Sequence, residues 1–345
     1  MTLPVFDGHN DLLLRLHEDE AGERNFLEES SEGHLDLPRA RRGGFAGGLF
    51  AVFVPGPKLA EPPDKPTGPY SLPLSPRVDP AEAHATADRL VELLFELERQ
   101  DALAVVTSAA QLQACLEGGP IAAVLHFEGA EPIRDLEDLE LFYERGLRTL
   151  GLVWSRENEY AEGVPFRFPA SPDTGPGLTA AGRELVRACN RLGVLVDLSH
   201  LNLRGFFDVA SISDAPLVAS HSNAHALCAS TRNLTDEQLD AVASSGGLVG
   251  VNFAVGFLRE DGQLEPDTPL ETVVRHIDYL VERMGIDHVG LGSDYEGAVP
   301  PTELGDVSLL PALFEALRER SYDEGALRKI ANENWVRVLR LTWGG

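Results

Sequence analysis

The first residues with obvious chemical potential stand near the start of the chain, in "PVFDGHNDLL". Apolar Val5 and Phe6 lead into His9 and Asp11, and the chain turns apolar again at Leu12. Side chains two residues apart on an extended strand point to the same side. We therefore expect His9 and Asp11 to converge on one point, where an imidazole and a carboxylate could hold a metal ion.

Similar residues end four further short apolar runs. These are Glu128 in "IAAVLHFEG", His200 in "GVLVDLSH", His221 in "APLVASHS" and Asp294 in "HVGLGSDY". Singly, each is more often a satisfied polar residue or a helix cap. Together, they would be costly to bury without a cation or compensating hydrogen bonds. Imidazole and carboxylate without thiolate suit Zn²⁺, while Mn²⁺, Fe²⁺ and Co²⁺ stay open, and the number of ligands fits two metals better than one.

Eight such apolar runs alternate with stretches of helical periodicity. The runs begin at Pro4, Gly47, Ile121, Leu147, Gly193, Ala215, Gly246 and His288. Helices are expected within 79–100, 179–193, 235–246 and 268–285, opening at the N-cap candidates Asp79, Thr179, Thr235 and Thr268. Nearly continuous apolar strands are typical of a parallel sheet buried on both faces. The pattern predicts an α/β fold, a TIM-type (β/α)8 barrel, with a doubly wound open sheet as the alternative. In such a barrel, functional groups lie at the carboxyl ends of the strands.

One segment interrupts this alternation. "PGPKLAEPPDKPTGPYSLPLSPRVDP", from Pro55 to Pro80, is too rich in proline for a helix or a central strand. We interpret it as a loop on one face of the barrel, either a lid or a dimer contact. The chain is thus expected to form a single barrel domain over 1–345, with a Pro-rich loop insertion at about 55–80.

Composition excludes several classes of function. The net charge of −26 argues against binding to nucleic acid or to an anionic membrane surface. No run approaches the roughly 20 apolar residues that span a bilayer. Cys115, Cys189 and Cys228 are far apart and show no CxxC spacing, which indicates neither a disulfide framework nor a cysteine zinc site. A cytoplasmic protein is expected, since the N-terminus also lacks a signal pattern.

The ordered motifs "DGHNDLL", "FEGA", "DLSH", "ASHSNAHAL", "TRNLTDEQL" and "GLGSDYEG" resemble the membrane (renal-type) dipeptidases, the zinc dipeptidase branch of the amidohydrolase superfamily. The resemblance runs nearly end to end. It implies a metal-dependent amidohydrolase-like (β/α)8 barrel with two zinc ions per chain, a homodimer, and hydrolysis of small dipeptides, including some with a D-residue at the C-terminal position.

The resemblance also implies roles for the metal ligands. His9 and Asp11 would bind one zinc, His200 and His221 the other, and Glu128 would bridge them. A hydroxide between the metals would attack the amide bond.

Two further roles follow from the same resemblance. Asp294 would be the catalytic acid/base, which takes a proton from the attacking water and delivers it to the leaving amine. Arg232, in "STRNL", would bind the free carboxylate of a dipeptide, a task that suits a guanidinium fork. Without the resemblance, a surface ion pair would be the better interpretation of Arg232.

One position departs from the family pattern. Many members carry a substrate-contacting histidine at the end of strand four, where this chain has Trp154 in "LGLVWSRENEY". The indole removes a hydrogen-bond donor and adds a large apolar wall beside the substrate. Substrate range is therefore the property that the resemblance does not carry over.

Two alternatives to a dipeptidase stay open at this stage. One is a related amidohydrolase acting on N-acyl amino acids or lactams, and the other is a catalytically silent metal-binding homologue. Among the remaining polar residues, His126 is expected in the core or behind the ligands, His225 at a helix start, and Glu296 as a loop cap or a support for the site.

Overall fold

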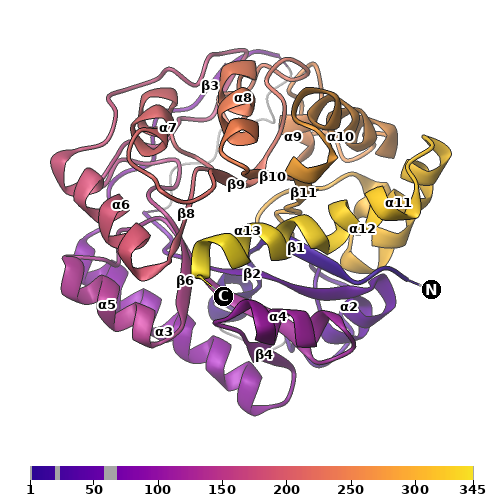
Figure 1. Ribbon diagram of the computed structural model, residues 1–345, viewed down its shortest axis with the longest axis horizontal. Coiled ribbons are helices and arrows are strands. Elements are labelled where there is room, and N and C mark those ends of the chain that lie inside the picture. Colours follow the sequence, from indigo (N-terminus) through magenta and orange to yellow (C-terminus); the bar gives the residue numbers. More distant parts are fainter. Residues whose placement is uncertain (1, 20–23, 58–67, 345) are drawn as a thin grey trace.

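The computed structural model describes residues 2–19, 24–57 and 68–344. Eight parallel strands form a closed ring with helices around it (Figure 1). β2 pairs with β1 on one side and β5 on the other, and this second pairing closes the ring. The predicted (β/α)8 barrel is confirmed, and the open doubly wound sheet is wrong. The barrel strands are β1 (Val5–Asn10), β2 (Phe45–Phe53), β5 (Ile121–Glu128), β6 (Leu147–Gly151), β8 (Leu195–Asp197), β9 (Val218–Ser222), β10 (Leu248–Val251) and β11 (Val289–Leu291).

Each of the eight apolar runs of the sequence overlaps a barrel strand. The longest pairing joins β2 to β5 in unbroken register from Gly47 opposite Ala122 to Phe53 opposite Glu128. Every residue of β5 is buried, as expected for a strand covered on both faces. This register delivers Glu128 to the carboxyl end of the barrel.

Three short strands were not predicted. β4 (Leu103–Val105) pairs with the first half of β5, on the same side as β6. β3 (Tyr70–Ser71) and β7 (Arg167–Phe168) form a separate antiparallel pair. This pair ties the Pro-rich segment to the long connection after β6. Residues 58–67 of that segment lie outside the described part of the chain.

Helix starts agree with the capping expectation in three of four cases. The side chains of Asp79 and Thr179 accept hydrogen bonds from the first turns of α3 (Pro80–Arg99) and α6 (Ala180–Leu192), and Thr235 forms a capping box with α8 (Asp236–Ser244). The expectation for Thr268 is wrong, because α10 starts at Leu270 after Pro269, and the Thr268 hydroxyl instead donates to the Glu265 carbonyl at 2.6 Å.

The helices surround the barrel strands (Figure 1). They are α1 (Leu12–Glu18), α2 (Leu37–Gly43), α3 (Pro80–Arg99), α4 (Ala109–Leu116), α5 (Leu136–Glu144), α6 (Ala180–Leu192), α7 (Leu203–Ala210), α8 (Asp236–Ser244), α9 (Val255–Leu258), α10 (Leu270–Met284), α11 (Leu310–Glu319), α12 (Glu324–Arg328) and α13 (Asn334–Trp343). Within the described ranges, none is long and apolar enough to cross a bilayer.

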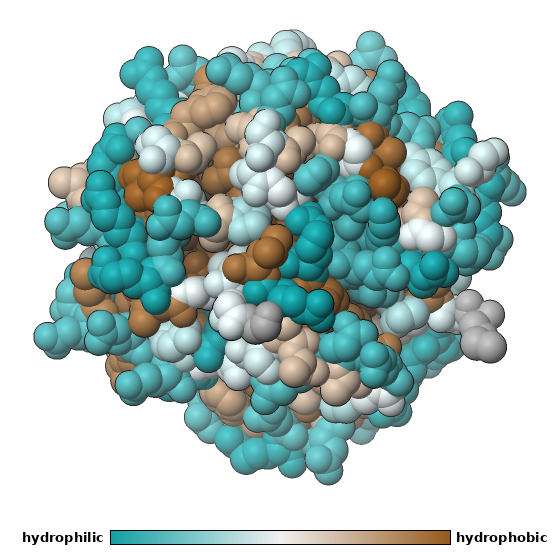
Figure 2. Space-filling view, viewed as in Figure 1, coloured by the Kyte–Doolittle hydropathy of each residue, from teal (hydrophilic) through white to brown (hydrophobic). Residues whose placement is uncertain are grey.

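The last helix, α13, lies across one end of the barrel (Figure 1). Its Trp335 is fully buried, lies at a tilt against the Phe6 ring and donates its indole N–H to the Leu291 carbonyl at 2.9 Å. A Cβ on Gly8 would lie 2.4 Å from this indole, so a glycine is required there. The outer surface of this face is mostly hydrophilic, with scattered apolar residues (Figure 2). The carboxyl ends of the strands lie at the opposite end.

Candidate active site

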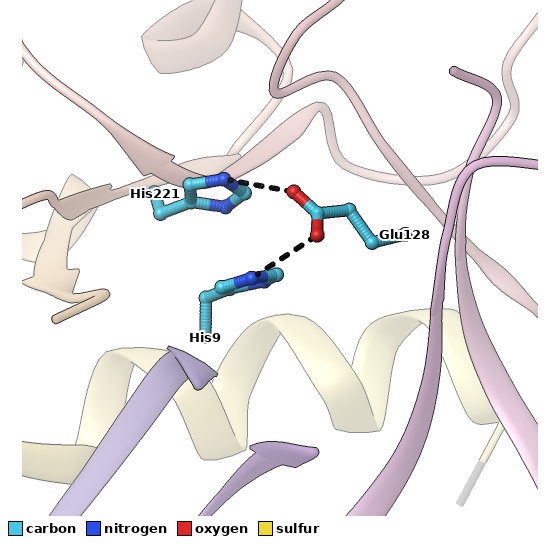
Figure 3. A group of neighbouring side chains, drawn as sticks. All are labelled: His9, Glu128 and His221. Atoms are coloured by element: carbon cyan, nitrogen blue, oxygen red, sulfur yellow. Dashed lines mark ion pairs between the residues drawn. The ribbon is translucent and has the colours of Figure 1, made fainter. Parts of the chain in front are cut away.

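A carboxylate lies between three imidazoles at the carboxyl end of the barrel. One oxygen of Glu128, Oε1, is 3.0 Å from His200 Nε2 and 3.6 Å from His221 Nε2. The other, Oε2, is 3.6 Å from His9 Nε2. Figure 3 shows Glu128 reaching between the rings of His9 and His221 with one oxygen toward each. This position gives one carboxylate access to ligand atoms on both sides of the site.

His9 also belongs to a second group of potential ligands. Its Nε2 is 3.3 Å from Asp11 Oδ2, and one ligand atom from each of His9, Asp11 and Asp294 lies within 4.8 Å of the others. The atoms of His9, Glu128 and His221 satisfy the same limit. The fold therefore brings together, from five strand ends, all six residues expected to carry the metal chemistry.

Three of these six residues lie beyond the strands themselves. Asp11 follows the end of β1 and is the N-cap residue of α1. His200 and Asp294 come three residues after β8 and β11, in left-handed backbone with φ of 66° and 61°. Non-glycine residues adopt this conformation rarely, and it often marks functional sites. The simple picture of alternating strand residues was therefore wrong for Asp11, although its side chain does meet His9.

Hydrogen bonds fix which nitrogen of His221 faces the cluster. The Ser220 hydroxyl donates its one hydrogen to Asp197 Oδ2 at 2.5 Å, so it must accept the bond from His221 Nδ1 at 2.7 Å. A neutral His221 then has an unprotonated Nε2. Ser155 Oγ lies 2.9 Å from Nδ1 of His200, so a serine hydroxyl contacts the Nδ1 atom of each of these two histidines. Metal-binding histidines are commonly oriented by such contacts at the second ring nitrogen.

The electrostatics of the cluster depend on burial. Burial would lower the pKa of His9, but the carboxylates of Glu128 and Asp11 raise it to about 10. Burial raises the pKa of Glu128 to about 8, although His9 opposes this, and it lowers the pKa of His200 and His221 well below the usual value. The neutral forms of these last two imidazoles are the forms that bind metal.

A divalent cation fits this set of donors. Both ring nitrogens of His9 are buried without a hydrogen-bond partner in the described part of the chain. The Nε2 atoms of His200 and His221 face each other at 3.1 Å, beside the Glu128 carboxylate. A cation between imidazole and carboxylate donors would satisfy these atoms.

Asp294 is held by a residue that the sequence analysis did not single out. Asn252 donates from Nδ2 to Asp294 Oδ2 at 2.9 Å, and the Asp294 amide donates to the His9 carbonyl at 3.1 Å. Burial raises the pKa of Asp294 to about 6. Asn252 lies inside the seventh apolar run and directly follows β10, so its position at a strand end was a signal that could have revealed it.

Glu296, two residues later, is buried and supports the same loop. Its Oε1 accepts hydrogen bonds from the backbone N–H groups of His34 and Leu35, both at 2.8 Å, and pairs with the Arg24 guanidinium. Its own carbonyl accepts from Arg15 Nε at 2.8 Å. Glu296 therefore joins the loop after β11 to the N-terminal segment and does not reach the metal cluster.

Arg232 is almost fully buried next to His221. Its Nη2 donates to the His221 carbonyl at 3.1 Å, and its guanidinium lies 5.4 Å from the centre of the Phe257 ring. Its Nε has no hydrogen-bond partner in the described ranges. The interpretation of Arg232 as a surface ion pair is therefore wrong.

A pocket of about 480 Å³ opens beside the cluster. Asp11, Glu128, His200 and Asp294 contribute to its lining, and Trp154 forms part of its wall. The indole centre lies 5.9 Å from that of the His200 ring. The large apolar group expected from the sequence thus lies close to the ligands.

His126 and His225, which the sequence also singled out, lie outside the ligand set. His126 is buried in the barrel, where Nδ1 bonds the Thr149 hydroxyl at 2.9 Å and the ring meets His9 edge-on. His225 lies in a turn and its Nε2 bonds the Ala170 carbonyl at 2.9 Å. The expectation that His225 starts a helix is wrong, because the next helix begins only at Asp236.

Comparisons with known proteins agree with this geometry. Residues 1–342 match the family model described as membrane dipeptidase, peptidase family M19. A Rhodobacter sphaeroides metallo peptidase, solved with a phosphinate mimic of the dipeptide L-Ala-D-Ala, is 50% identical, with a TM-score of 0.96 over 99% of this chain and 100% of that one. An uncharacterized protein in the pqqA 5' region of Klebsiella pneumoniae is 51% identical over 70% of this chain and 89% of its own length. Dipeptidase tcpJ of Claviceps purpurea is 29% identical over 97% of this chain and 76% of its own length.

Proposed function

Because the chain belongs to the membrane dipeptidase family and is a metal-dependent dipeptidase, we propose that it works with two zinc ions held at the cluster described above. One observation carries this proposal: Glu128 presents one oxygen to His9 and the other to His200 and His221. A single carboxylate placed in this way suits a bridge between two cations.

The proposed ligands divide into two sets around that bridge. His9 and Asp11 bind one zinc, and His200 and His221 bind the other. The unprotonated Nε2 of His221 and the unpartnered nitrogens of His9 support this division. Mixed imidazole and carboxylate ligands are typical of zinc in hydrolases.

The chemistry divides between the metals and Asp294. When bound, the two ions supply a Lewis acid for the scissile carbonyl and lower the pKa of the attacking water. Asp294 takes the proton of that water and gives it to the leaving amine. Asn252 holds one Asp294 oxygen, which keeps the carboxylate oriented while the proton moves.

Substrate is held at its free carboxylate by Arg232. Its buried Nε has no hydrogen-bond partner among the described residues, which supports the substrate carboxylate as the acceptor at this point. Dipeptides of L,L and L,D configuration are the proposed substrates. The L,D part is supported by the similar Rhodobacter sphaeroides protein, which was solved with a mimic of L-Ala-D-Ala.

Metal analysis together with turnover tests this proposal. We expect about two equivalents of zinc per chain, and hydrolysis of L,L and L,D dipeptides that a chelator abolishes and added zinc restores. One equivalent at full activity would contradict the bridged pair. A matched sample of the Glu128→Gln variant should lose zinc and activity together.

A substitution of Arg232 distinguishes a dipeptidase from the alternative, a related amidohydrolase acting on N-acyl amino acids or lactams. Arg232→Met should raise KM for dipeptides strongly, with a smaller effect on kcat, and should leave a substrate with an amidated C-terminus unaffected. An unchanged KM would remove the proposed anchor. A catalytically silent homologue does not fit a family of peptide hydrolases. The single domain, the homodimer and the cytoplasmic localisation stay predictions.

A further inference from the structure

We propose that the pocket beside the cluster selects dipeptides with large apolar side chains, with Trp154 as a specificity-determining residue and Arg156 as its positioning residue. This inference rests on the proposed function, since it names the substrates of that same site. It concerns the walls of the pocket and is independent of which metal is bound.

The pocket separates charged and apolar groups. Its acids and His200 belong to the cluster, and Arg15, whose side chain is 45% exposed, is the other charged residue among the lining groups described. The remaining lining residues are apolar, aromatic or glycine, and the aromatic ones are Phe53, Tyr70, Trp154, Phe166 and Phe257. A volume of about 480 Å³ lies within the range of roughly 300–1,000 Å³ typical of small-molecule sites.

Four of these five aromatic residues, all but Tyr70, contact one another in a continuous wall. Trp154 meets Phe53 and Phe166 edge-on, with ring centres 5.1 and 5.6 Å apart, and Phe166 is stacked parallel to Phe257 at 6.1 Å. Because the indole also lies 5.9 Å from the His200 ring, a side chain next to the scissile bond would contact this wall.

Arg156 fixes Trp154 without lining the pocket. Its guanidinium lies 5.1 Å from the ring centres of both Phe53 and Trp154, an arrangement in which cation and ring attract. Nη2 donates to the Val54 carbonyl at 2.7 Å, and Nε is 3.3 Å from Glu131 Oε1. The residue is 1% exposed. It therefore holds the two rings of the wall in place from outside the pocket.

The composition of the wall predicts a ranking of substrates. One methylene in an apolar pocket changes kcat/KM by roughly 10- to 200-fold. Leucine or phenylalanine dipeptides should therefore exceed Ala-Ala by about tenfold or more. A glutamate side chain would lose its hydration without gaining a partner on this wall, so its dipeptides should rank below Ala-Ala.

A dipeptide panel tests the ranking. Ala-Ala is compared with peptides that carry leucine, phenylalanine or glutamate at the first or the second position, each in L,L and L,D form, on the zinc-loaded enzyme. We expect the leucine or phenylalanine peptides to lead at one position at least. The proposal would be overturned if Ala-Ala were hydrolysed as fast as the leucine and phenylalanine peptides. A preference for glutamate peptides that is lost in the Arg15→Met variant would also overturn it.

Variants separate the roles of the two residues. Trp154→Ala should reduce the phenylalanine-to-alanine ratio of kcat/KM to near 1, and Arg156→Lys should reduce it partly, because an ammonium lacks the planar stacking of the guanidinium. Trp343→Ala, at the far end of α13, is the control and should keep the wild-type ratio. A wild-type ratio in Trp154→Ala would mean that the indole does not determine specificity.

Binding provides a readout that does not need turnover. Calorimetry of the same peptides on the zinc-loaded Asp294→Asn variant should give the same ranking of Kd. If the wild-type enzyme hydrolysed none of the dipeptides but the variant kept this ranking of Kd, the proposed function would be wrong and the selectivity of the pocket would be supported. Turnover of all the dipeptides with equal Kd values and equal rates would support the proposed function and overturn the selectivity of the pocket.

Discussion

Asp294 combines a left-handed backbone with a buried carboxylate. One of its oxygens is held by Asn252, and burial raises its pKa to about 6. A general acid/base contributes about 10²- to 10⁴-fold to a rate. We therefore expect Asp294→Asn to lower kcat by this factor while the zinc content stays unchanged, measured by steady-state kinetics and metal analysis of one preparation.

Asp101 offers a matched control for this change. It is also an aspartate in left-handed backbone, with φ of 56°, but it is exposed and lies in the turn after α3. Asp101→Asn should leave kcat at the wild-type value. If Asp294→Asn lost its zinc as well, the carboxylate would be acting as a metal ligand and its role would have to be revised.

Residue types at strand ends made much of the site predictable. His9, Glu128 and His221 lie within or at the ends of their strands, so the barrel alone brings them together. Contacts of His200 and Asp294 could not be derived in the same way, because both depend on left-handed turns after the strand. Their roles as ligands and acid stay predictions, although their proximity is observed.

At the level of elements, the loop after β11 is joined to the N-terminal segment by Glu296. Its carboxylate accepts two backbone hydrogen bonds and pairs with Arg24. Glu296→Gln keeps one oxygen acceptor for these partners but removes the charge that strengthens the two backbone bonds and the pair with Arg24. We expect a loss of about 1–3 kcal/mol in the free energy of unfolding, measured by urea denaturation, and a lower kcat with unchanged zinc content, because Asp294 is on the same loop.

Glu18→Gln is the control for that variant. Glu18 is a partly exposed carboxylate that pairs with Arg15 at 3.4 Å. An exposed pair of this kind contributes at most about 1 kcal/mol. Equal destabilisation by the two substitutions would mean that Glu296 does not hold the loop.

The elements themselves were more predictable than their connections. Alternating apolar runs located all eight barrel strands, because strands buried on both faces need apolar side chains throughout. The pair of β3 and β7 could not be anticipated, since two residues of strand carry no periodic signal. The wall residues Phe166 and Phe257 were missed for a related reason: their contact joins the loop before β7 to the short helix α9, which are distant in the sequence.

At the scale of the whole molecule, stability should depend on pH through buried histidines outside the site. His276 of α10 accepts from the Ala224 amide and bonds the Leu258 carbonyl, and burial lowers its pKa to about 4. The unfolded chain would bind a proton near pH 6.5, so the stabilisation is complete above that pH and is lost as the pH falls from 6.5 toward 4.

Between pH 7 and pH 5 this group should cost the wild type about 2 kcal/mol in the free energy of unfolding. His276→Gln removes the titration and keeps one donor and one acceptor. Urea denaturation at both pH values should therefore show a smaller loss for the variant than for the wild type. Identical losses would exclude His276 as a source of acid sensitivity.

Closure of the ring by β2 and β5 has a consequence for association between chains. An open sheet exposes a row of unpaired N–H and C=O groups at each edge, which another chain can extend. The eight described barrel strands have both neighbours, and the additional strand β4 is only three residues long. Partial opening between β2 and β5 would expose two edges of nine and eight residues at once. The closed ring therefore keeps these two long edges paired with each other, so that neither is open to extension by a second chain.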